Sequence, residues 1–401
     1  MEDVVVVSAV RTPIGSIGGT LRDTQPELLL TTVLQTALEH AQVARELPDE
    51  VICGQTKQSA DQPNIARLAS LMAGIPEETP AYTVHRQCAS GLQAILSGFQ
   101  QIECGYSDVV LCGGVESMST APFYVRGARF GVGSGNQVFV DPNVESQPRS
   151  QPRDIYGTFG MIETADRVAK EYGIERESCD TFALGSQKKA LRAIDEGLFR
   201  EEIVPVTIPR KKGDSLTFDT DEYPKRDTDE AKMARLRPIF PGGVTTAGNA
   251  SGRNDGAAAL LLMSGERARA LGHRPLARIV GAAAAGVDPR VMGMGPVAAV
   301  RRLLQRCLQP RGIMLEDIEL IELNEAFAAQ ALACIEVLNL RPDRVNVNGG
   351  AIALGHPLGC SGARISVTLL HEMRRRSARY GLATLCVAGG LGMAMAFENL
   401  S

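Results

Sequence analysis

Short apolar runs and amphipathic stretches alternate along the first part of the chain. Val4 to Ser8 and Val51 to Gly54 are short runs rich in β-branched residues, which is typical of buried strands. Leu28 to Ala41 has the periodicity of a helix, and a second helix is predicted over Asn64 to Ala73, because glycine and proline follow it. This alternation predicts an α/β fold.

A strand-to-helix junction is predicted around Cys88. Tyr82 to Val84 is typical of a strand, and from Leu92 to Ile102 apolar residues recur at helical spacing. A thiol at the start of a helix meets the positive end of the helix dipole, which favours the thiolate. Cys88 is therefore a candidate nucleophile, and a small buried structural cysteine is the alternative. The next strand is predicted over Asp108 to Cys112, closed by Gly113-Gly114.

The middle of the chain, residues 121–250, interrupts this pattern. Glycine-rich, polar and charge-dense stretches follow one another there: Gly127 to Gly135, Asn143 to Asp154 and Arg210 to Arg235. Helical periodicity remains in Met161 to Tyr172 and Cys179 to Glu196. From Gly256 onward the alternating pattern returns, so we expect a large insertion into an α/β core.

A weak internal similarity relates the two ends of the chain. The first half contains Cys88-Ala89-Ser90-Gly91, a helix, and a strand ending at Gly113-Gly114. The second half contains Cys360-Ser361-Gly362, a helix predicted from Ala363 to Arg376, and a strand ending at Gly389-Gly390. One match of this kind is compatible with a duplicated unit and does not establish it.

Composition and charge narrow the class of protein. A length of 401 residues allows two to three domains at roughly 150 residues each. The net charge of −4 is spread without long blocks of one sign, so bulk charge predicts neither a nucleic-acid nor an anionic-membrane partner. No apolar run reaches the ~18 residues of a membrane span, and the acidic amino terminus is unlike a signal peptide. Nine cysteines without a Cys-x-x-Cys pair favour a reduced compartment and no zinc or iron–sulfur site; we expect a cytoplasmic protein.

Three further residues are candidates for chemistry. His356 stands between Gly355 and Pro357 in a glycine-rich segment, and a histidine is the usual partner that deprotonates a thiol. A loop histidine bonded to a carbonyl is the alternative. Cys386 ends a buried strand before a glycine-rich turn, whose amides can face an oxyanion. Asn324 follows the strand Ile318 to Leu323 and is most simply the N-cap of the next helix.

Motifs in a fixed order along essentially the whole chain resemble those of the thiolase family, enzymes that make or cleave the bond between the α-carbon of one acyl-CoA and the thioester carbon of another. The motifs are Arg11-Thr12-Pro13, Gln87 to Gly91, Gly113 to Ser119, Thr246 to Gly252, Asn324 to Ala328, Asn348 to Arg364 and Leu385 to Gly392. The resemblance implies two similar halves packed as a five-layered αβαβα core with an inserted loop domain. The corresponding division is 1–120 plus 251–277 for the first half, 121–250 for the loop domain and 278–401 for the second half.

The resemblance also implies a role for each candidate. Cys88 would accept the acyl group, His356 would activate it, and Cys386 would act as acid and base at the α-carbon or the CoA thiol. Asn324 would hold a water in one oxyanion hole beside His356, and the amides of Cys88 and Ala388 would form the other. The implied substrate contacts are Ser251 and Ala247 to pantetheine, Met161 and Met292 at the short acyl pocket, Phe240 and Phe327 in the pocket wall, and Lys225 or Arg226 near the adenine and phosphates. The two phenylalanines could equally be core, and the two cations a solvated face.

Departures from the family pattern bear on the substrate. Ala388 replaces the first of three glycines, and Gly160 replaces a histidine that lines the pantetheine tunnel in short-chain members. The two pocket methionines favour acetoacetyl-sized substrates, so acetyl-CoA C-acetyltransferase is the preferred function. A degradative 3-ketoacyl-CoA thiolase of broader chain length is the alternative, because Gly160 and the unusual stretch Gln137 to Arg153 leave room for longer acyl groups.

Two other classes share this resemblance in part. A ketoacyl synthase lacks the second catalytic cysteine, so Cys386 disfavours it, and a non-catalytic acyl-CoA or lipid carrier usually lacks one reactive residue. The expected partners are acetyl-CoA, acyl-CoA and CoA as substrate or product, with no metal, no other cofactor, no nucleic acid and no membrane. Family members are dimers or tetramers, so a homo-oligomer, and a homotetramer in particular, is expected.

Overall fold

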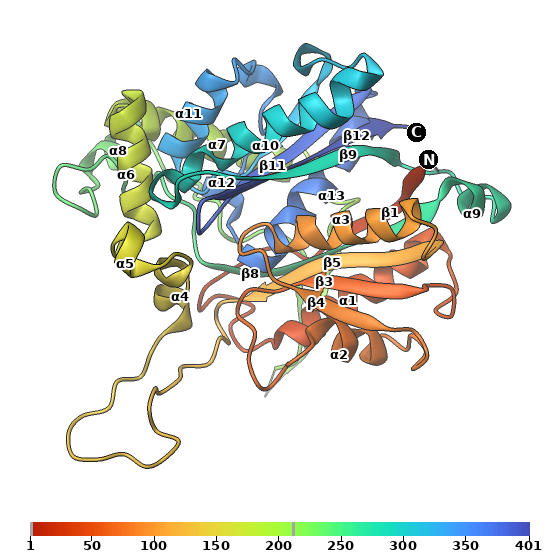
Figure 1. The fold of residues 1–401 in the computed structure, drawn as a ribbon, viewed down its shortest axis with the longest axis horizontal. Coiled ribbons are helices and arrows are strands. Elements are labelled where there is room, and N and C mark those ends of the chain that lie inside the picture. The colour runs from red at the N-terminus through yellow and green to blue at the C-terminus, as the bar shows by residue number, and fades with distance from the viewer. Residues whose placement is uncertain (1–2, 211–212) are drawn as a thin grey trace.

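The computed structural model describes residues 3–210 and 213–401, and its core is built of five layers (Figure 1). The first sheet contains β1 (Val4–Arg11), β3 (Glu50–Gly54), β4 (Ala81–Val84), β5 (Val109–Ser117) and β8 (Asn254–Ser264). The second contains β9 (Ala277–Gly286), β10 (Leu320–Leu323), β11 (Tyr380–Val387) and β12 (Leu391–Asn399). The helices α3 (Ser90–Glu103) and α13 (Leu358–Arg376) lie between the sheets. The outer layers are α1 (Pro26–Ala41) with α2 (Ile65–Met72), and α10 (Gly295–Leu303) with α11 (Ala328–Val337).

The two sheets meet along one edge. In the described part of the chain the strand order is β10-β11-β12-β9-β1-β8-β5-β3-β4, with a short β2 (Gly15–Ser16) beside β8. The junction is a short antiparallel pairing of Val5 with Arg278 and Val6 with Ala277. Each half combines parallel and antiparallel pairs, for example β3 with β4 and β11 with β12. The α/β prediction and the five-layered fold are therefore confirmed.

Glycines allow the two central helices to approach closely. A Cβ on Gly91 would lie 2.8 Å from the amide nitrogen of Ala363, and a Cβ on Gly362 would lie 2.3 Å from that of Leu92. Contacts this short are possible only without a side chain. The Ser-Gly pairs of the internal similarity therefore mark the point where α3 and α13 touch, which brings the segments before both helices together.

The two Gly-Gly pairs have different structural roles. Gly389 and Gly390 have φ angles of +88° and +80° and form the tight turn between β11 and β12. The prediction that Gly113-Gly114 closes the preceding strand is wrong, because β5 continues to Ser117. These glycines are required instead because other backbone segments lie close to them. A Cβ on Gly113 would lie 2.5 Å from the Ala258 carbonyl oxygen, and a Cβ on Gly114 would lie 2.2 Å from the Gly359 carbonyl oxygen. The predicted start of the last helix at Ala363 is also wrong, since α13 begins at Leu358.

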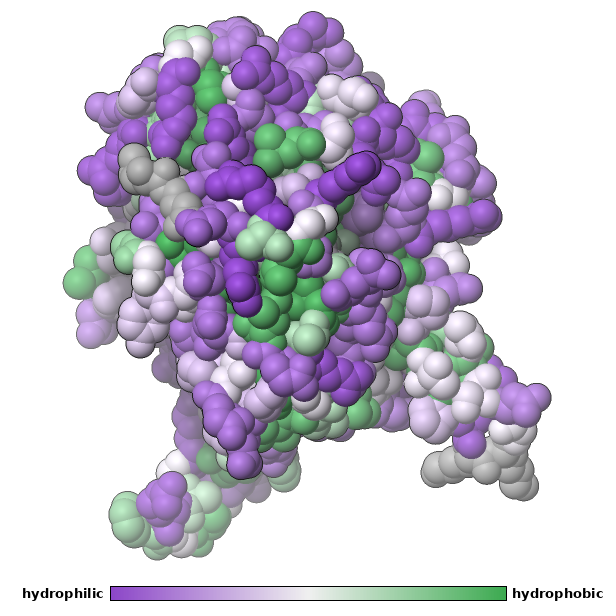
Figure 2. Space-filling view, turned by 90° about the vertical axis from the view of Figure 1, so that its right-hand side faces the viewer, coloured by the Kyte–Doolittle hydropathy of each residue, from purple (hydrophilic) through white to green (hydrophobic). Residues whose placement is uncertain are grey.

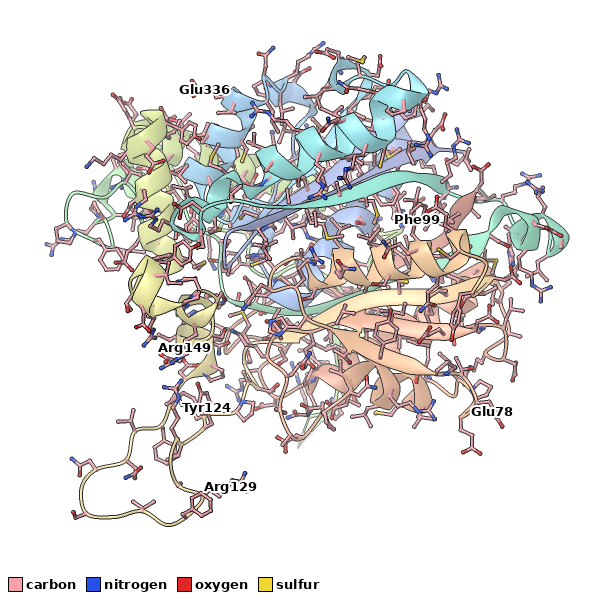
Figure 3. The ribbon with its side chains drawn as sticks, viewed as in Figure 1. Glu78, Phe99, Tyr124, Arg129, Arg149 and Glu336 are labelled. Atoms are coloured by element: carbon pink, nitrogen blue, oxygen red, sulfur yellow. The ribbon has the colours of Figure 1, made fainter. Side chains whose placement is uncertain are left out.

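The inserted segment lies on one side of the core (Figure 1). Its helices are α4 (Pro142–Glu145), the single turn η1 (Gln147–Arg149), α5 (Arg153–Tyr156), α6 (Met161–Tyr172), α7 (Arg176–Asp195) and α8 (Glu230–Arg235). A long loop before α4 projects away from the body, and it carries Tyr124 and Arg129, with Arg149 near its base (Figure 3). The exact boundaries of the three predicted parts stay a prediction.

Apolar side chains are gathered between the layers. Figure 2 shows one face on which polar residues predominate and an apolar area lies near the centre. Within the described ranges, no helix combines the length and the apolar character that crossing a membrane requires.

Candidate active site

Cys88 stands at a sharp bend between β4 and α3. The residue before it, Gln87, has a φ angle of +45°, a left-handed conformation that is strained for a residue with a side chain. The bend is held by the Ser90 amide, which donates to the Gln87 carbonyl at 3.0 Å, and by the Gln87 side-chain amide, which donates to Ser150 Oγ at 2.8 Å. Only 8% of Cys88 is exposed, and that part faces a cavity.

This cavity has a volume of about 480 Å³ and lies between the core and the inserted segment. Three of the predicted catalytic residues line it, namely Cys88, His356 and Cys386, although they come from distant parts of the chain. All six predicted pantetheine-contact and pocket residues line it as well: Met161, Phe240, Ala247, Ser251, Met292 and Phe327. The fold therefore brings most of the predicted site together in one place.

Hydrogen bonds fix the ring of His356 and its tautomer. Nδ1 lies 2.6 Å from the Ser361 hydroxyl, and that hydroxyl donates to the Pro357 carbonyl at 2.9 Å. With the hydroxyl proton directed there, Nδ1 is assigned as the donor to Ser361. Nε2 is then unprotonated, and the side-chain amide nitrogen of Asn324 lies 3.4 Å from it. The His356 amide donates to Asn254 Oδ1 at 2.9 Å, which fixes the backbone as well.

Burial favours the neutral form of both candidate reacting groups. Desolvation lowers the pKa of His356 to about 3, and the positive charge of Arg364 adds to the effect. Desolvation raises the pKa of Cys88 to about 11, although hydrogen bonds from the Ala388 amide and from its own amide favour the thiolate. A neutral imidazole beside a neutral thiol can accept its proton when a substrate arrives.

Cys386 and Ala388 belong to the end of β11 and the turn that follows. Cys386 is fully buried and packs with Met292 and Phe327, and burial raises its pKa well above the usual value. The φ angle of Ala388 lies outside the left-handed region, so a Cβ is tolerated where the family has glycine. The backbone N–H of Ala388 favours the thiolate form of Cys88.

Asn324 does not cap a helix. The next helix, α11, begins at Ala328 and its N-cap is Phe327, so the N-cap prediction is wrong. The Asn324 amide instead donates to the Thr384 carbonyl at 2.9 Å, which ties this segment to β11 and turns the side chain toward His356. Its Oδ1 is buried and finds no hydrogen-bond partner among the described residues. An acceptor left in this way has room for a donor such as water.

The two predicted cations lie away from the cavity wall. Lys225 Nζ lies 4.8 Å from the centre of the Tyr223 ring and lines a smaller neighbouring cavity, which shares Tyr223 and Ala247 with the main one. Arg226 is exposed and forms an ion pair with Asp195 at 2.6 Å. This pairing favours the solvated-face alternative for Arg226, whereas Lys225 stays close to the mouth of the site.

Several lining residues were missed by the sequence reasoning. Arg253 directly follows the Thr246 to Gly252 motif and lines the cavity, as do Asn143, Val144 and Gln147 of the inserted segment. Arg253 could have been found by extending the motif. The other three lie in an irregular polar stretch, where no periodicity indicates which side chains point inward.

Gly160 leaves space at the cavity wall. It is the N-cap of α6, and its amide donates to Glu163 Oε2 at 2.5 Å. A Cβ added there would meet only that oxygen, at 3.6 Å.

No group of three histidine, cysteine or carboxylate side chains in the described part of the chain could hold a metal ion.

Comparison with known proteins agrees with these features. Family models described as thiolase, N-terminal domain, and thiolase, C-terminal domain, match residues 4–266 and 273–399. The chain is 48% identical to an acetyl-CoA acetyltransferase of Pseudomonas aeruginosa, over 98% of this chain and 99% of that protein. The crystal structure of the Bacillus anthracis acetyl-CoA acetyltransferase is similar with a TM-score of 0.95 and 45% identity, covering 100% and 99% of the two chains. Human mitochondrial 3-ketoacyl-CoA thiolase in complex with CoA is similar with a TM-score of 0.93 and 41% identity, covering 99% and 98%.

Proposed function

We propose, since the chain belongs to the thiolase family, that it transfers acyl groups between coenzyme A thioesters. In one direction this is the condensation of acetyl-CoA with an acyl-CoA, and in the other the cleavage of a 3-ketoacyl-CoA by CoA. The observation that carries the proposal is the convergence of Cys88, His356 and Cys386 on one largely apolar cavity. Of the reactions in this class, acetyl-CoA C-acetyltransferase is the one we favour.

The first half-reaction moves an acyl group onto Cys88. His356 Nε2 takes the proton of the thiol, and the thiolate attacks the thioester carbonyl. The tetrahedral oxyanion is held by the amides of Cys88 and Ala388, which also favour the thiolate of this cysteine. The carbon–sulfur bond to CoA then breaks, and the CoA thiolate takes the thiol proton of Cys386. The acyl group remains on Cys88, Cys386 is left as a thiolate, and His356 stays protonated.

The second half-reaction forms the carbon–carbon bond. Cys386, as a thiolate, removes a proton from the α-carbon of a second acetyl-CoA, and the enolate attacks the acyl group on Cys88. A water held by Asn324 Oδ1, together with His356, faces the enolate oxygen. The unpartnered Oδ1 among the described residues supports this role. The Cys88–carbon bond breaks, the Cys88 thiolate takes its proton back from His356, and 3-ketoacyl-CoA leaves. Cys386 keeps the α-proton as a thiol, so each group returns to its starting state; thiolysis follows the same steps backwards.

These steps balance without any further co-reactant. Two thiols and one imidazole supply every proton transfer. Backbone amides, the imidazole and the water held by Asn324 supply every oxyanion contact. We therefore propose that the enzyme needs no metal and no cofactor beyond CoA as substrate or product.

The acyl group and the CoA chain would occupy different parts of the cavity. Met161, Met292 and Phe327 would bound a short acyl pocket. Ala247 and Ser251 would contact pantetheine, and Phe240 would form part of the cavity wall. Lys225, at the neighbouring cavity, would meet the adenine or phosphate region, a role for which the ion-paired Arg226 is less suited. The open space at Gly160 specifically favours the second candidate, a degradative thiolase of broader chain length.

We further propose a homo-oligomer, a dimer or a tetramer, in the cytoplasm. The projecting loop supports oligomerisation, because Phe130 is 98% exposed and Phe139 is 73% exposed. Val132 and Val138 of the same loop are also exposed, and large apolar side chains gathered on one exposed segment mark an interaction site. The nine cysteines are all free thiols, which supports a reducing compartment.

The test is CoA-dependent thiolysis of 3-ketoacyl-CoAs from acetoacetyl-CoA to 3-ketopalmitoyl-CoA, with catalytic efficiency compared by chain length. A sharp preference for acetoacetyl-CoA supports acetyl-CoA C-acetyltransferase, and a flat profile supports the degradative alternative. Binding of acyl-CoA without turnover at any length would reject both and leave the carrier class.

A further inference from the structure

Lys57 is a buried cation that the mechanism above does not use. Its side chain is only 6% exposed, although an ammonium group is costly to bury. Nζ donates to the Pro142 carbonyl at 2.9 Å and to Ser146 Oγ at 2.5 Å. Both partners are uncharged, and Lys57 forms no ion pair with any carboxylate of the described residues. A salt bridge therefore does not explain why an ammonium group is buried at this position.

The topology places Lys57 close to Cys88. Strands β3 and β4 are parallel neighbours, with Gly54 opposite Val84 at their carboxyl ends. Lys57 follows β3 and Cys88 follows β4 after only a few residues, so both leave the sheet at the same edge.

The same short piece of the inserted segment binds both of these loops. Lys57 holds Ser146, while Gln87, the residue before Cys88, donates to Ser150 at 2.8 Å. The Ser150 hydroxyl in turn lies 3.4 Å from the Ser146 carbonyl. Between these two serines lies η1, whose Gln147 and Pro148 line the cavity. Lys57 and Gln87 therefore fix one wall of the cavity from two sides.

Charges around Lys57 connect it with the nucleophile. The groups that face Lys57 are Glu116, Cys88, Asp141 and Arg253. Burial lowers the pKa of Lys57, and the two carboxylates and the Cys88 thiolate oppose this effect. In return the Lys57 charge favours the thiolate of Cys88, and Glu116 opposes it.

Glu116 is already engaged in holding the backbone. It accepts hydrogen bonds from the amides of Thr56 at 3.1 Å, Lys57 at 3.0 Å and Gly359 at 2.9 Å, and also from the Thr56 hydroxyl. These bonds fix its position and disperse its charge. The remaining groups that face Cys88 are the Ala388 amide, His356 and Cys386. Lys57 is thus a full positive charge that favours the thiolate of Cys88.

We propose that Lys57 is a positioning residue for the acyl-transfer reaction: it fixes the wall formed by α4 and η1 and holds a buried positive charge next to Cys88, which increases the fraction of reactive thiolate. This inference rests on the proposed function, in which Cys88 is the nucleophile. It predicts two separable effects, one on the cavity wall and one on the reactivity of the thiol.

The experiment follows alkylation of Cys88 by iodoacetamide as a function of pH, without any acyl-CoA, with the modified peptide quantified by mass spectrometry. Two neutral variants, Lys57→Met and Lys57→Gln, are compared with the charge-keeping Lys57→Arg. Ser146→Ala is the matched control, because it removes one hydrogen bond of the wall and leaves the charge. Thermal unfolding shows whether each variant is folded. If Lys57→Met does not fold, the comparison uses Lys57→Gln, whose amide can still donate to the Pro142 carbonyl.

We expect both neutral variants to alkylate about tenfold more slowly near neutral pH, with the midpoint moved up by about one pH unit, the lower end of the effect of a neighbouring opposite charge. Lys57→Arg and Ser146→Ala should keep the wild-type midpoint. Acylation by acetyl-CoA should slow by a similar factor in the neutral variants and recover as pH rises. A rise in KM, the effect expected from the cavity wall, should also appear in Ser146→Ala.

A wild-type midpoint in the neutral variants would overturn the proposal, and so would an equal shift in Ser146→Ala, since a purely structural role would then suffice. Because alkylation needs no substrate, the two proposals can fail separately. A Lys57-dependent midpoint without any thiolysis would reject the proposed function alone. Normal thiolysis with an unmoved midpoint would reject only the role of Lys57.

Discussion

The contact between α3 and α13 makes Gly362 the most informative position to change. In Gly362→Ala the new Cβ would lie 2.3 Å from the Leu92 amide nitrogen and 2.7 Å from its Cβ. Backbone atoms cannot rotate away, so the two helices must separate. Overpacking of this kind destabilises by about 1 to 3 kcal/mol. Because Cys88 lies just before α3 and His356 just before α13, the separation of these two residues should change too. A displacement of 1 Å in a catalytic geometry can lower the rate about a hundredfold.

Gly185→Ala is the matched control for this substitution. Gly185 lies inside α7, and a Cβ there would meet no atom within 4 Å among the described residues. Both substitutions gain the helix propensity of alanine over glycine, up to about 1 kcal/mol, so their difference isolates the contact.

The assay is urea unfolding together with thiolysis of acetoacetyl-CoA. We expect the control to be as stable as the wild type or more so, with full activity. Gly362→Ala should lose stability, and its kcat should fall more than its KM changes. Wild-type stability and activity in Gly362→Ala would refute the claim that this glycine contact sets the distance between the two reacting residues.

Three further predictions concern the site itself. Cys88→Ala should abolish acyl-enzyme formation. Cys386→Ala should still be acylated but should fail in condensation and in exchange of the acetyl-CoA α-proton. Equal loss of acylation and condensation in Cys386→Ala would contradict the division of roles. Ser361→Ala removes the acceptor of the His356 Nδ1 proton. Hydrogen-bond partners that orient a metal-bound histidine are worth about 10- to 100-fold, and we expect single-turnover acylation to slow by a similar factor; an unchanged rate would show that the tautomer is fixed by other means. Gly160→His fills the open space beside the cavity and should reduce thiolysis of long 3-ketoacyl-CoAs relative to acetoacetyl-CoA. An unchanged chain-length profile would show that this part of the wall does not select the acyl group.

Local patterns were sufficient for the elements and for the candidate residues. The helix predicted over Leu28 to Ala41 is observed from Pro26 to Ala41, and the strand predicted from Val4 is observed there. Apolar spacing reports such elements because it depends on neighbours within a few residues. Cys88, His356 and Cys386 could be singled out because each stands in a short segment of unusual composition. The sequence by itself therefore determined the α/β class, the repeated Ser-Gly motif and the family.

Contacts between distant segments decided the rest. Gly113-Gly114 was expected to end a strand, yet these glycines admit the backbones of β8 and α13. Asn324 was expected to cap a helix and instead faces His356, and Arg226 is paired with Asp195. The sequence pattern did not indicate a role for Lys57, since a single lysine in a polar stretch is usually exposed. Each of these outcomes depends on which group lies opposite in space. Periodicity and composition describe only neighbours along the chain, whereas burial, hydrogen bonding and charge at the site depend on segments that only the folded layers bring together.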